Sequence, residues 1–549
     1  MLAFNTAGHD INASRVTRSG LPFIAITALA AGCILTSACT DVEPSRDAKG
    51  GDGVLRLSLP GEPRSLNPNV APLDDYALLL GQNIFSKLVS LADDGGVLPE
   101  VAERWDASAD GRTYTFYLRH GIRFHDGQPL TAEDVRATFA RIAESSNTEV
   151  ARRVASAQAP DASTVVITLK TPWAAFIPTL AWFGTSILPA HVYANVTWRG
   201  NPANMRPIGS GPFKFKSWEP GHRIVLEKNA DYFGQGPYVD ELEYVIAPSA
   251  AAGVQLLLDG RTDYFVGRAP VNLVPQLSRT PGIRVSTSPS DGRAYLAFNV
   301  RRAPFNDRRA RRAVNLAIDR RRIIDRVLSG IGTPAVGFYT PSVAWAYNGA
   351  ARVPDRDPIE AQRLWATVAR QSLPSPIITF MYPGQENAAP SALVAEVIQQ
   401  LREVGMQVRL KPLPSHDYLE RLQNEHDFDI VVLSGNQGPD PDWLVARFGS
   451  AGSMQPMGYA NDELDAVLAT GGRQLDPTTR ASAYFRAQEI LAADLPIAPL
   501  YETVRVTVFR DGIRGLPQED AHGLVPDYTF NLVRLPRPDA ARSAPPQHQ

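Results

Sequence analysis

Helical and strand-like hydrophobic periods alternate across residues 391–433, and this alternation is the feature that most constrains the fold. Apolar side chains first recur at helical spacing up to Gly405, where a helix end favours a residue with a left-handed backbone. Residues 406–410 then alternate apolar and polar side chains as a half-buried strand does. After a second helical stretch, the apolar run 428–433 suits a buried strand. Strands separated by helices predict an α/β lobe with a partly parallel sheet.

The chain is too long for a single hydrophobic core. It has 549 residues, and a prior of about 150 residues per domain suggests about three domains. Its formal net charge of −2 gives no overall field that would attract nucleic acid, so we expect no nucleic-acid partner. Residues 536–549 are rich in Pro, Ala and Gln and have little to bury, which predicts a disordered tail.

The N-terminal part of the chain has the pattern of a secretory signal. Arg15 and Arg18 precede an apolar run from Leu21 to Leu35, and small residues follow this run. A permanent membrane anchor is the alternative, but spanning a bilayer takes about 20 apolar residues and the run is shorter. We therefore predict a signal peptide over residues 1–38, with export to the periplasmic space or cell envelope.

Both cysteines of the chain lie at the end of this apolar run. The sequences before Cys33 and Cys39 each resemble the bacterial lipobox, in which the cysteine is diacylated and becomes the new N-terminus. We prefer Cys39 because polar sequence follows it at once, although Thr36 stands where a leucine is usual, and Cys33 is the alternative. A chain that begins at Cys39 has no second thiol and therefore no internal disulfide. We expect residues 39–53 to form a lipidated tether that holds the protein on the membrane.

Three segments of the sequence carry recognisable motifs. The first segment has an alternating strand, a Phe-His-Asp-Gly turn and a helix opened by Thr131, and the second has the motif Ile-Gly-Ser-Gly-Pro-Phe. The third has Pro-Phe-Asn-Asp before an arginine-rich helix. The three segments are Leu98–Val135, Ile208–Phe233 and Tyr295–Val314, and in this order and spacing they cover nearly the whole mature chain. Together they resemble the family 5 extracellular solute-binding proteins of ABC importers, which include oligopeptide-, dipeptide- and nickel-binding proteins.

The resemblance implies an α/β, two-lobed periplasmic-binding-protein-like fold (type II, cluster C) with an extra domain on one lobe. Such proteins close their two lobes around the solute. Because the chain then crosses between lobes more than once, we expect hinges at Tyr295–Phe298 and Leu500–Val504. The implied boundaries are 54–72, 206–288 and 505–535 for a discontinuous domain I, 73–205 for domain II and 289–504 for domain III.

The resemblance also places the solute in the loop that follows the strand at 428–433. Relatives carry an acid there that binds a peptide's α-amino group. The residues at the matching positions, Asn436 and Gln437, are neutral, so we expect no such contact with the amine unless Asp440 has taken the role. The loop before residue 391 lacks the arginine that would bind a peptide carboxylate with two hydrogen bonds. The predicted ligand-binding residues are Asn436, Gln437, Asp440, Asp442, Trp443, Tyr382, Gln385 and Asn387. Plain structural loops are the alternative for both segments.

The sequence lacks common catalytic and metal-binding motifs. It contains no His-Glu-x-x-His, Cys-x-x-Cys, Gly-x-Ser-x-Gly or Gly-x4-Gly-Lys pattern, so we predict no catalytic residue, no metal site and no cofactor. ATP hydrolysis would then belong to a separate subunit of the partner permease. We expect His125 to hydrogen-bond within its own turn. We expect the arginine-rich run 301–322 to be the solvated face of an amphipathic helix, with importer or anionic-lipid contact as alternatives.

These observations together predict a monomeric binding module and not an enzyme. It would be a lipoprotein that captures a peptide or peptide-like small polar solute and passes it to an ABC permease. A peptide-sensing or chaperone-like envelope lipoprotein on the same scaffold is the alternative, and an opine, oligosaccharide or nickel binder is less favoured. An envelope hydrolase would need a paired nucleophile and base, which the sequence does not show.

Overall fold

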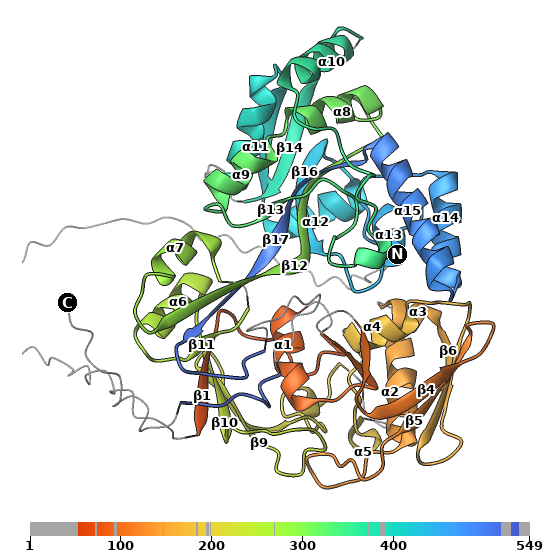
Figure 1. Ribbon diagram of the computed structural model, residues 1–549, viewed down its shortest axis with the longest axis vertical. Coiled ribbons are helices and arrows are strands. Elements are labelled where there is room, and N and C mark those ends of the chain that lie inside the picture. The colour runs from red at the N-terminus through yellow and green to blue at the C-terminus, as the bar shows by residue number, and fades with distance from the viewer. Residues whose placement is uncertain are drawn as a thin grey trace, which may run out of the picture. The chain divides into compact units, whose positions relative to one another are not determined.

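The computed structural model describes most of the chain beyond residue 52 (Figure 1). The described residues are 53–71, 74–92, 96–145, 148–182, 185–193, 197, 199–267, 269–371, 374–384, 390–517 and 529–536. The predicted signal peptide, Cys33, Cys39, Gln385 and Asn387 lie outside them, as do nearly all of the predicted tether and tail. The described residues all belong to the second of two compact units, Ser45–Gln549. None of the helices within them is long and apolar enough to cross a membrane.

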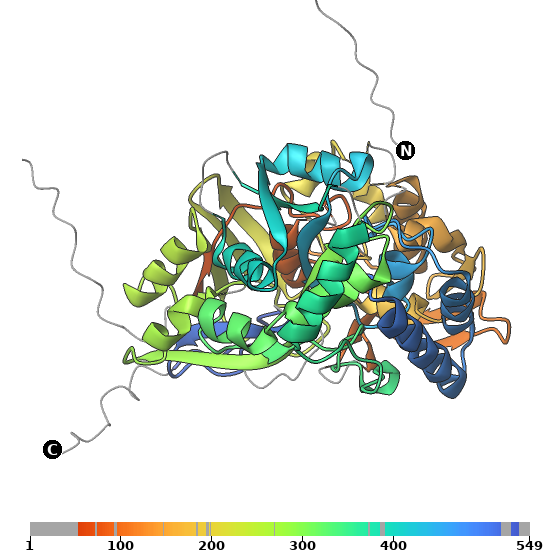
Figure 2. The same ribbon diagram turned by 90° about the horizontal axis from the view of Figure 1, so that it is seen from above.

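A mixed sheet of eleven strands is the main element within the described residues. Its two longest strands, β12 and β17, form an antiparallel pair that is seen side by side in Figures 1 and 2. The strand order is β15 (Gln407–Leu413), β14 (Ile377–Pro383), β16 (Ile430–Asn436), β12 (Ile283–Phe298), β17 (Ile497–Arg510), β11 (Tyr264–Phe265), β1 (Val54–Leu59), β10 (Glu241–Ile246), β9 (Arg223–Lys228) and β8 (Phe213–Glu219), with β13 (Thr333–Pro334) paired to β17.

The segment 391–433 folds as its hydrophobic periods predict. Ser391 caps helix α11 (Ala392–Glu403) by accepting a hydrogen bond from the backbone N–H of Val394, and Gly405 takes a φ of 83° beyond its end. Helix α12 (Ser415–Glu420), extended by the π-helical turn η4 (Arg421–Glu425), connects β15 to β16. Strand β14 pairs in parallel with both β15 and β16. The predicted partly parallel sheet is confirmed.

The buried apolar residues form two principal groups, which we call the first and the second lobe. The core of the first lobe takes residues between Leu55 and Val266 and between Phe509 and Val533. The core of the second lobe takes residues between Tyr295 and Leu500, in two clusters on either side of the sheet strands. Both β12 and β17 contribute to the second lobe, and their other ends pack in a smaller cluster with α6 and α7. The boundaries between domains I, II and III stay predictions.

The remaining elements are distributed between these lobes. The first lobe holds a four-stranded antiparallel sheet in the order β4 (Ala102–Ala107), β5 (Thr113–Leu118), β7 (Thr164–Leu169) and β6 (Val154–Gln158), and the hairpin β2 (Val89–Leu91) and β3 (Val97–Pro99). Helices up to residue 277 are α1 (Asp75–Ile84), α2 (Ala132–Ser145), α3 (Glu149–Arg153), α4 (Phe176–Trp182), α5 (Ala190–Tyr193), α6 (Ala250–Leu258) and α7 (Val274–Leu277), with 3-10 turns η1 (Pro202–Asn204) and η2 (Val271–Leu273). Later helices are α8 (Arg308–Ala317), α9 (Arg320–Val327), α10 (Pro358–Gln371), α13 (Trp443–Phe448), α14 (Asp462–Arg473) and α15 (Pro477–Asp494), with η3 (Ala344–Ala346).

The register of β12 and β17 is interrupted at two points, of which the first is the larger. Pro289 pairs with Val504 and Arg293 with Glu502, so three residues of β12 face one residue of β17 between these pairs. A second shift separates Ala294 from Tyr295. Of the two expected hinges, Leu500–Val504 lies opposite the interruption, whereas Tyr295–Phe298 pairs regularly with β16. Both stay predictions.

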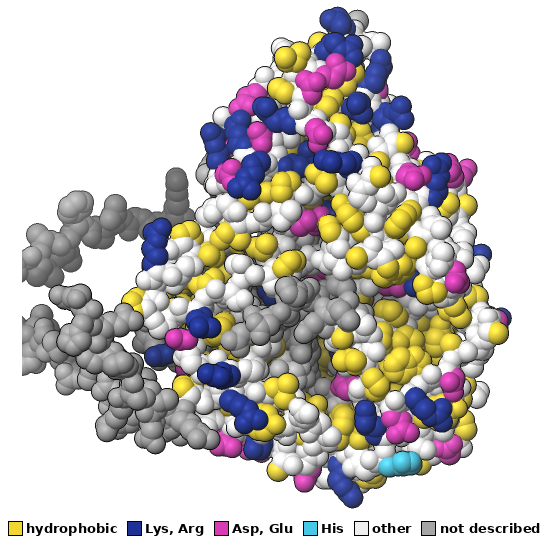
Figure 3. All heavy atoms as spheres, viewed as in Figure 1, with side chains coloured by type: hydrophobic (Ala, Val, Ile, Leu, Met, Phe, Trp, Pro, Cys, Tyr) yellow, Lys and Arg dark blue, Asp and Glu magenta, His cyan; other side chains and the backbone are white. Residues whose placement is uncertain are grey.

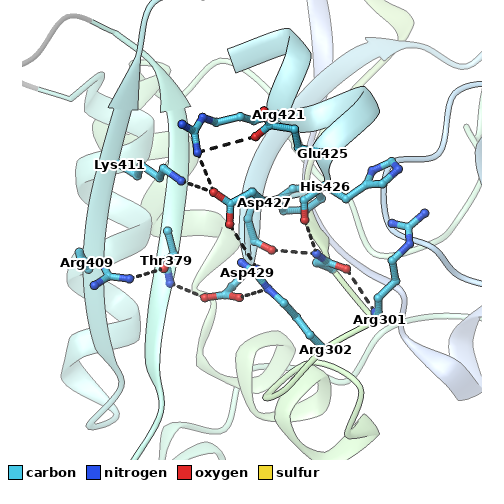
Figure 4. A network of polar contacts seen from close by, with 12 residues as sticks. Arg301, Arg302, Thr379, Arg409, Lys411, Arg421, Glu425, His426, Asp427 and Asp429 are labelled. Carbon is cyan, nitrogen blue, oxygen red and sulfur yellow. Dashed lines mark hydrogen bonds and ion pairs between the residues drawn. The ribbon is translucent and has the colours of Figure 1, made fainter. Parts of the chain in front are cut away.

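The arginine-rich run 301–322 is only partly a solvated face. Lys and Arg side chains do gather over the part of the second lobe that holds α8–α10 (Figure 3). The prediction is wrong for Arg311 and Arg320, however, because both are buried and donate to backbone carbonyls of residues 494–499. Arg302 joins a polar network at the start of β16, in which it contacts Asp427 and Asp429 (Figure 4). These arginines connect segments far apart in the sequence.

Candidate functional site

The loop between β16 and α13, residues 437–442, is held by hydrogen bonds from its backbone to β12 and to Tyr339. The backbone N–H of Gln437 donates to the backbone carbonyl of Asp291 at 2.8 Å, and Tyr339 donates its hydroxyl to the carbonyl of Gly438 at 3.1 Å. Gly438 has a φ of +83°, and a Cβ there would lie 2.5 Å from Cδ1 of Trp443. Only glycine fits this turn without strain, and the turn sets the position of the Trp443 ring.

Asp440 forms a buried ion pair within the second lobe. Its Oδ1 accepts a hydrogen bond from Nη2 of Arg480 at 2.6 Å and another from the backbone N–H of Asp442 at 2.9 Å. Arg480 also donates Nε–H to the carbonyl of Gly471 at 2.9 Å. Since Asp440 is only 2% exposed, its charge is balanced by Arg480 and not by solvent. An ammonium group of a solute would have to compete with that guanidinium.

Asp442 joins the two lobes. Its Oδ2 accepts a hydrogen bond at 2.7 Å from the indole Nε1–H of Trp173, in the first lobe, and lies 3.7 Å from Nη2 of Arg153 in the same lobe. The guanidinium of Arg153 also lies 4.8 Å from the centre of the Trp173 ring. Burial raises the pKa of the Asp442 carboxyl to about 6, against the opposing attraction of Arg153. The carboxyl group is therefore costly to ionise although it has two partners in the first lobe.

Two further contacts connect the lobes beside Asp442. The rings of Trp443 and Trp182 meet edge to face, with centres 4.9 Å apart and planes at 88°. The backbone N–H of Ala174 donates to the carbonyl of Gly472 at 2.8 Å. A Cβ at Gly472 would lie 2.5 Å from Oδ1 of Asp442, so the helix α14 approaches this carboxylate closely only because residue 472 is glycine.

The other predicted site residues have different surroundings. Asn436, at the end of β16, accepts a hydrogen bond on its backbone carbonyl from Nη2 of Arg447. Gln437 is buried and its side-chain amide lies 3.4 Å from the carbonyl of Gly435. Tyr382 is buried in the second-lobe core, at the end of β14. The structure thus brings Asn436, Gln437 and the residues up to Trp443 together but packs the Tyr382 ring into the core.

His125 connects two loops of the first lobe and does not bond within its own turn as expected. Its Nδ1 accepts a hydrogen bond from the backbone N–H of Gly209 at 3.2 Å, and its Nε2 lies 3.1 Å from the carbonyl of Gly211. These partners require a neutral ring that carries its proton on Nε2. Burial lowers the pKa of His125 to about 4, which agrees with that neutral form.

Comparison with known proteins decides the family. Residues 96–456 match the family described as bacterial extracellular solute-binding proteins, family 5 Middle. The chain belongs to this family. The resemblance stated from the sequence motifs is confirmed, and so is the α/β fold of the two-lobed binding-protein class.

Individual relatives of this family 5 chain are named for peptides. It is 28% identical to the probable di/tripeptide-binding protein 5 of Pseudomonas aeruginosa (strain UCBPP-PA14) over 79% of this chain and 87% of the relative. It is 30% identical to the probable D,D-dipeptide-binding periplasmic protein DdpA of Escherichia coli (strain K12), over 82% of this chain and 88% of the relative. It also resembles the ABC transporter-associated periplasmic binding protein DppA from Helicobacter pylori, solved with the peptide STSA, with a TM-score of 0.75, 25% identity, and coverage of 88% and 98%. All three are named as binding proteins, and the Helicobacter pylori protein is named as associated with an ABC transporter.

Several residues of the site in this family 5 chain were not predicted from the sequence. Trp173, Arg153 and Arg480 hold the two carboxylates of the loop, and Arg447 contacts Asn436. Trp173 is 269 positions from Asp442, and no local pattern marks such a pair. The spacing of Trp443 and Arg447 by four positions is the one signal that was available, because residues so spaced share a helix face.

Proposed function

We propose that this chain is the solute-binding component of an ABC importer and captures a peptide or peptide-like solute between its two lobes. The observation that carries the proposal is the hydrogen bond between Trp173 and Asp442. This hydrogen bond supports the proposal because Asp442, which belongs to the loop that the family resemblance associates with solute, bonds a residue of the other lobe. A solute held by residues 436–443 would then stabilise, in the same place, the contacts that keep the lobes together.

The proposed working step is closure of the lobes about β12 and β17. The Trp173–Asp442 and Trp182–Trp443 contacts can form only when the lobes are close together. A solute that binds both lobes lowers the free energy of the closed state alone and so shifts the population toward that state. Binding with a micromolar dissociation constant would need about 8 kcal/mol in total, including the cost of closure.

The charges around the loop bear on the class of solute. Asp440 is paired with Arg480, and Asp442 faces Trp173 and Arg153, so neither carboxylate is free to receive an ammonium. Asn436 and Gln437 are neutral amides. We therefore propose a solute that does not depend on a free α-amino group, such as a modified peptide or another amide-rich polar compound.

The proposed cellular context follows from the N-terminal sequence. We propose that residues 1–38 are a signal peptide and that Cys39, or alternatively Cys33, is lipidated and holds a monomeric protein at the membrane of the cell envelope. The transported solute would pass to a permease whose separate ATPase subunits supply the energy. Mass spectrometry of the protein from its native membrane would identify the acylated cysteine, and an unmodified N-terminal peptide would contradict this assignment.

Native mass spectrometry and small-angle scattering test the central proposal. The protein as purified, and after incubation with a tripeptide library, should retain a solute and become more compact on binding it. Trp443→Ala should weaken binding by about 1 kcal/mol, a factor of about five, because it removes the contact with Trp182. Trp218→Ala is the matched control, since Trp218 bonds Glu62 in the first lobe, away from the loop. No retained solute, together with scattering that no compound changes, would contradict the proposal.

A further inference from the structure

Arg447 is a buried guanidinium with far fewer partners than its charge requires. The residue is 6% exposed, and its one hydrogen bond within the described part of the chain runs from Nη2 to the backbone carbonyl of Asn436. Its Nε is buried without a hydrogen-bond partner. Among the described residues, no carboxylate lies within ion-pair distance of its guanidinium, which is bonded to a neutral oxygen alone.

Other buried arginines of the second lobe are well satisfied. Arg293, which is 1% exposed, forms an ion pair with Glu502 and donates to the carbonyls of Gly337 and Tyr339. Arg480 has Asp440 and a carbonyl as partners. A buried cation with a single neutral partner is costly, because the solvation it has lost is not replaced. Arg447 therefore differs from its neighbours in a way that packing alone does not explain.

The position of Arg447 relates it to the contact between the lobes. Trp443 and Arg447 are four positions apart on α13 and lie on the same face of the helix, whereas Leu444 and Phe448 face the second-lobe core. Trp443 meets Trp182 of the first lobe. The guanidinium of Arg447 thus lies on the same face of α13 as Trp443, which contacts the first lobe, and next to the end of β16.

The surrounding charges limit what Arg447 can bind. Burial raises the pKa of Tyr339, Asp440 and Asp291 add to this rise, and Arg447 opposes it, so all three charged groups lie within electrostatic reach of the Tyr339 hydroxyl. Asp291 accepts a hydrogen bond from the backbone N–H of Gly438, and Arg447 donates to the carbonyl of Asn436, so both lie beside the same loop. Two nearby carboxylates would repel a doubly charged phosphate, and phosphate sites usually gather several donors. A single guanidinium with unused N–H groups suits a carboxylate, which carries one negative charge and accepts two parallel hydrogen bonds.

We propose that Arg447 binds a carboxylate of the solute. This inference rests on the proposed function, because it assumes that the solute lies at the contact between the lobes. It deepens that function by naming the solute class: a peptide-like compound with a free carboxylate and no required α-ammonium. Asn436 then has a positioning role, since its carbonyl orients the guanidinium through Nη2.

Matched peptide pools test the assignment. A tripeptide library acetylated at its N-termini is prepared in two forms, as free acids and as C-terminal amides, and binding is measured by native mass spectrometry and calorimetry. Wild-type protein should bind the acids about tenfold to a hundredfold more tightly than the amides, as expected for a charge-assisted hydrogen bond. Arg447→Met should lose this preference, and Arg447→Lys should keep part of it. Arg486→Gln, which changes an exposed arginine paired with Glu463, is the control and should behave as wild type.

The outcomes separate the two proposals. Equal binding of acids and amides by wild-type protein would overturn the assignment of Arg447 and leave the proposed function standing. Binding of neither pool, with no co-purified solute, would overturn both. Thermal unfolding of the solute-free protein gives an independent measurement. Arg447→Met should unfold at the same or a higher temperature than wild type, because it removes a buried charge whose hydrogen-bond partner is a neutral carbonyl. A fall of several degrees would mean that Arg447 is a structural tether, which would overturn the assignment.

Discussion

Replacing Asp442 with asparagine should remove a specific pH dependence of stability. The side-chain amide oxygen of the Asp442→Asn variant can still accept the hydrogen bond from the Trp173 indole, so the contact between the lobes should persist. What changes is the charge. The carboxyl of Asp442 has a pKa raised from 3.8 to about 6 by burial, whereas the amide does not titrate.

The magnitude follows from the two pKa values. Between pH 3.8 and about 6 the folded protein keeps this proton and the unfolded chain has lost it, so stability falls as the pH rises through this window. At about 1.4 kcal/mol per pH unit, the full effect is about 3 kcal/mol. About 2 kcal/mol of it should fall between pH 4.5 and pH 7.5.

Urea denaturation of solute-free protein at these two pH values measures the effect. Other titrating groups, such as His125, are shared by both proteins and cancel when the pH-induced change of wild type is compared with that of Asp442→Asn. The variant should gain about 2 kcal/mol relative to wild type on going from pH 4.5 to pH 7.5. Asp440→Asn is the contrasting control, because it leaves the buried guanidinium of Arg480 without its partner and should destabilise by about 3–5 kcal/mol at pH 7.5. An identical pH profile in wild type and Asp442→Asn would refute the reasoning.

Three further predictions concern other parts of the fold. Burial lowers the pKa of His125 to about 4, so wild type should lose up to about 3 kcal/mol as the pH falls from 6.5 to 4, and His125→Gln should lose less in urea denaturation over that range. The hydrogen bond from Lys411 lowers the pKa of Asp427 to about 2, so the stability that this ion pair contributes is lost as the pH falls from 3.8 to 2. Because the pair is partly exposed, Asp427→Asn should lower the free energy of unfolding by less than about 1 kcal/mol at neutral pH. A larger loss would contradict this expectation. Gly438→Ala should destabilise by at least about 1–2 kcal/mol and alter Trp443 fluorescence, since a Cβ there meets the ring; an unchanged spectrum and melting temperature would show that the turn adapts.

The local structure of the chain could be predicted from sequence because its signals are local. Apolar spacing and the glycine at 405 gave α11 and its neighbouring strands in the right order. Asp476 caps α15 by accepting a hydrogen bond from the backbone N–H of Thr479, and Pro477 begins the helix, a pair of residues that favours a helix start. Family resemblance supplied the two-lobed class, which no periodicity could have given.

The candidate site could be predicted only in part because its decisive contacts are between distant residues. The loop was located, but the partners of its carboxylates, Trp173 and Arg480, lie far from it in the sequence. Nor could sequence tell that Arg311 lies inside a lobe while Arg309 lies outside, because both belong to the same charged run. Burial, which decides whether an arginine is a surface charge or a binding residue, depends on the tertiary fold.

The interrupted register between β12 and β17 has a consequence for how the molecule can flex. Residues 290–292 stand opposite Thr503 alone, and Ser290 holds that position by donating its hydroxyl to the Thr503 carbonyl at 3.0 Å. Bending a regular ladder would stretch its backbone bonds, but here few such bonds exist to be stretched. Between these two strands the chain is therefore held in part by a side chain, and under the lobe closure proposed above, substituting Ser290 should change how fast the lobes open and not whether the protein folds.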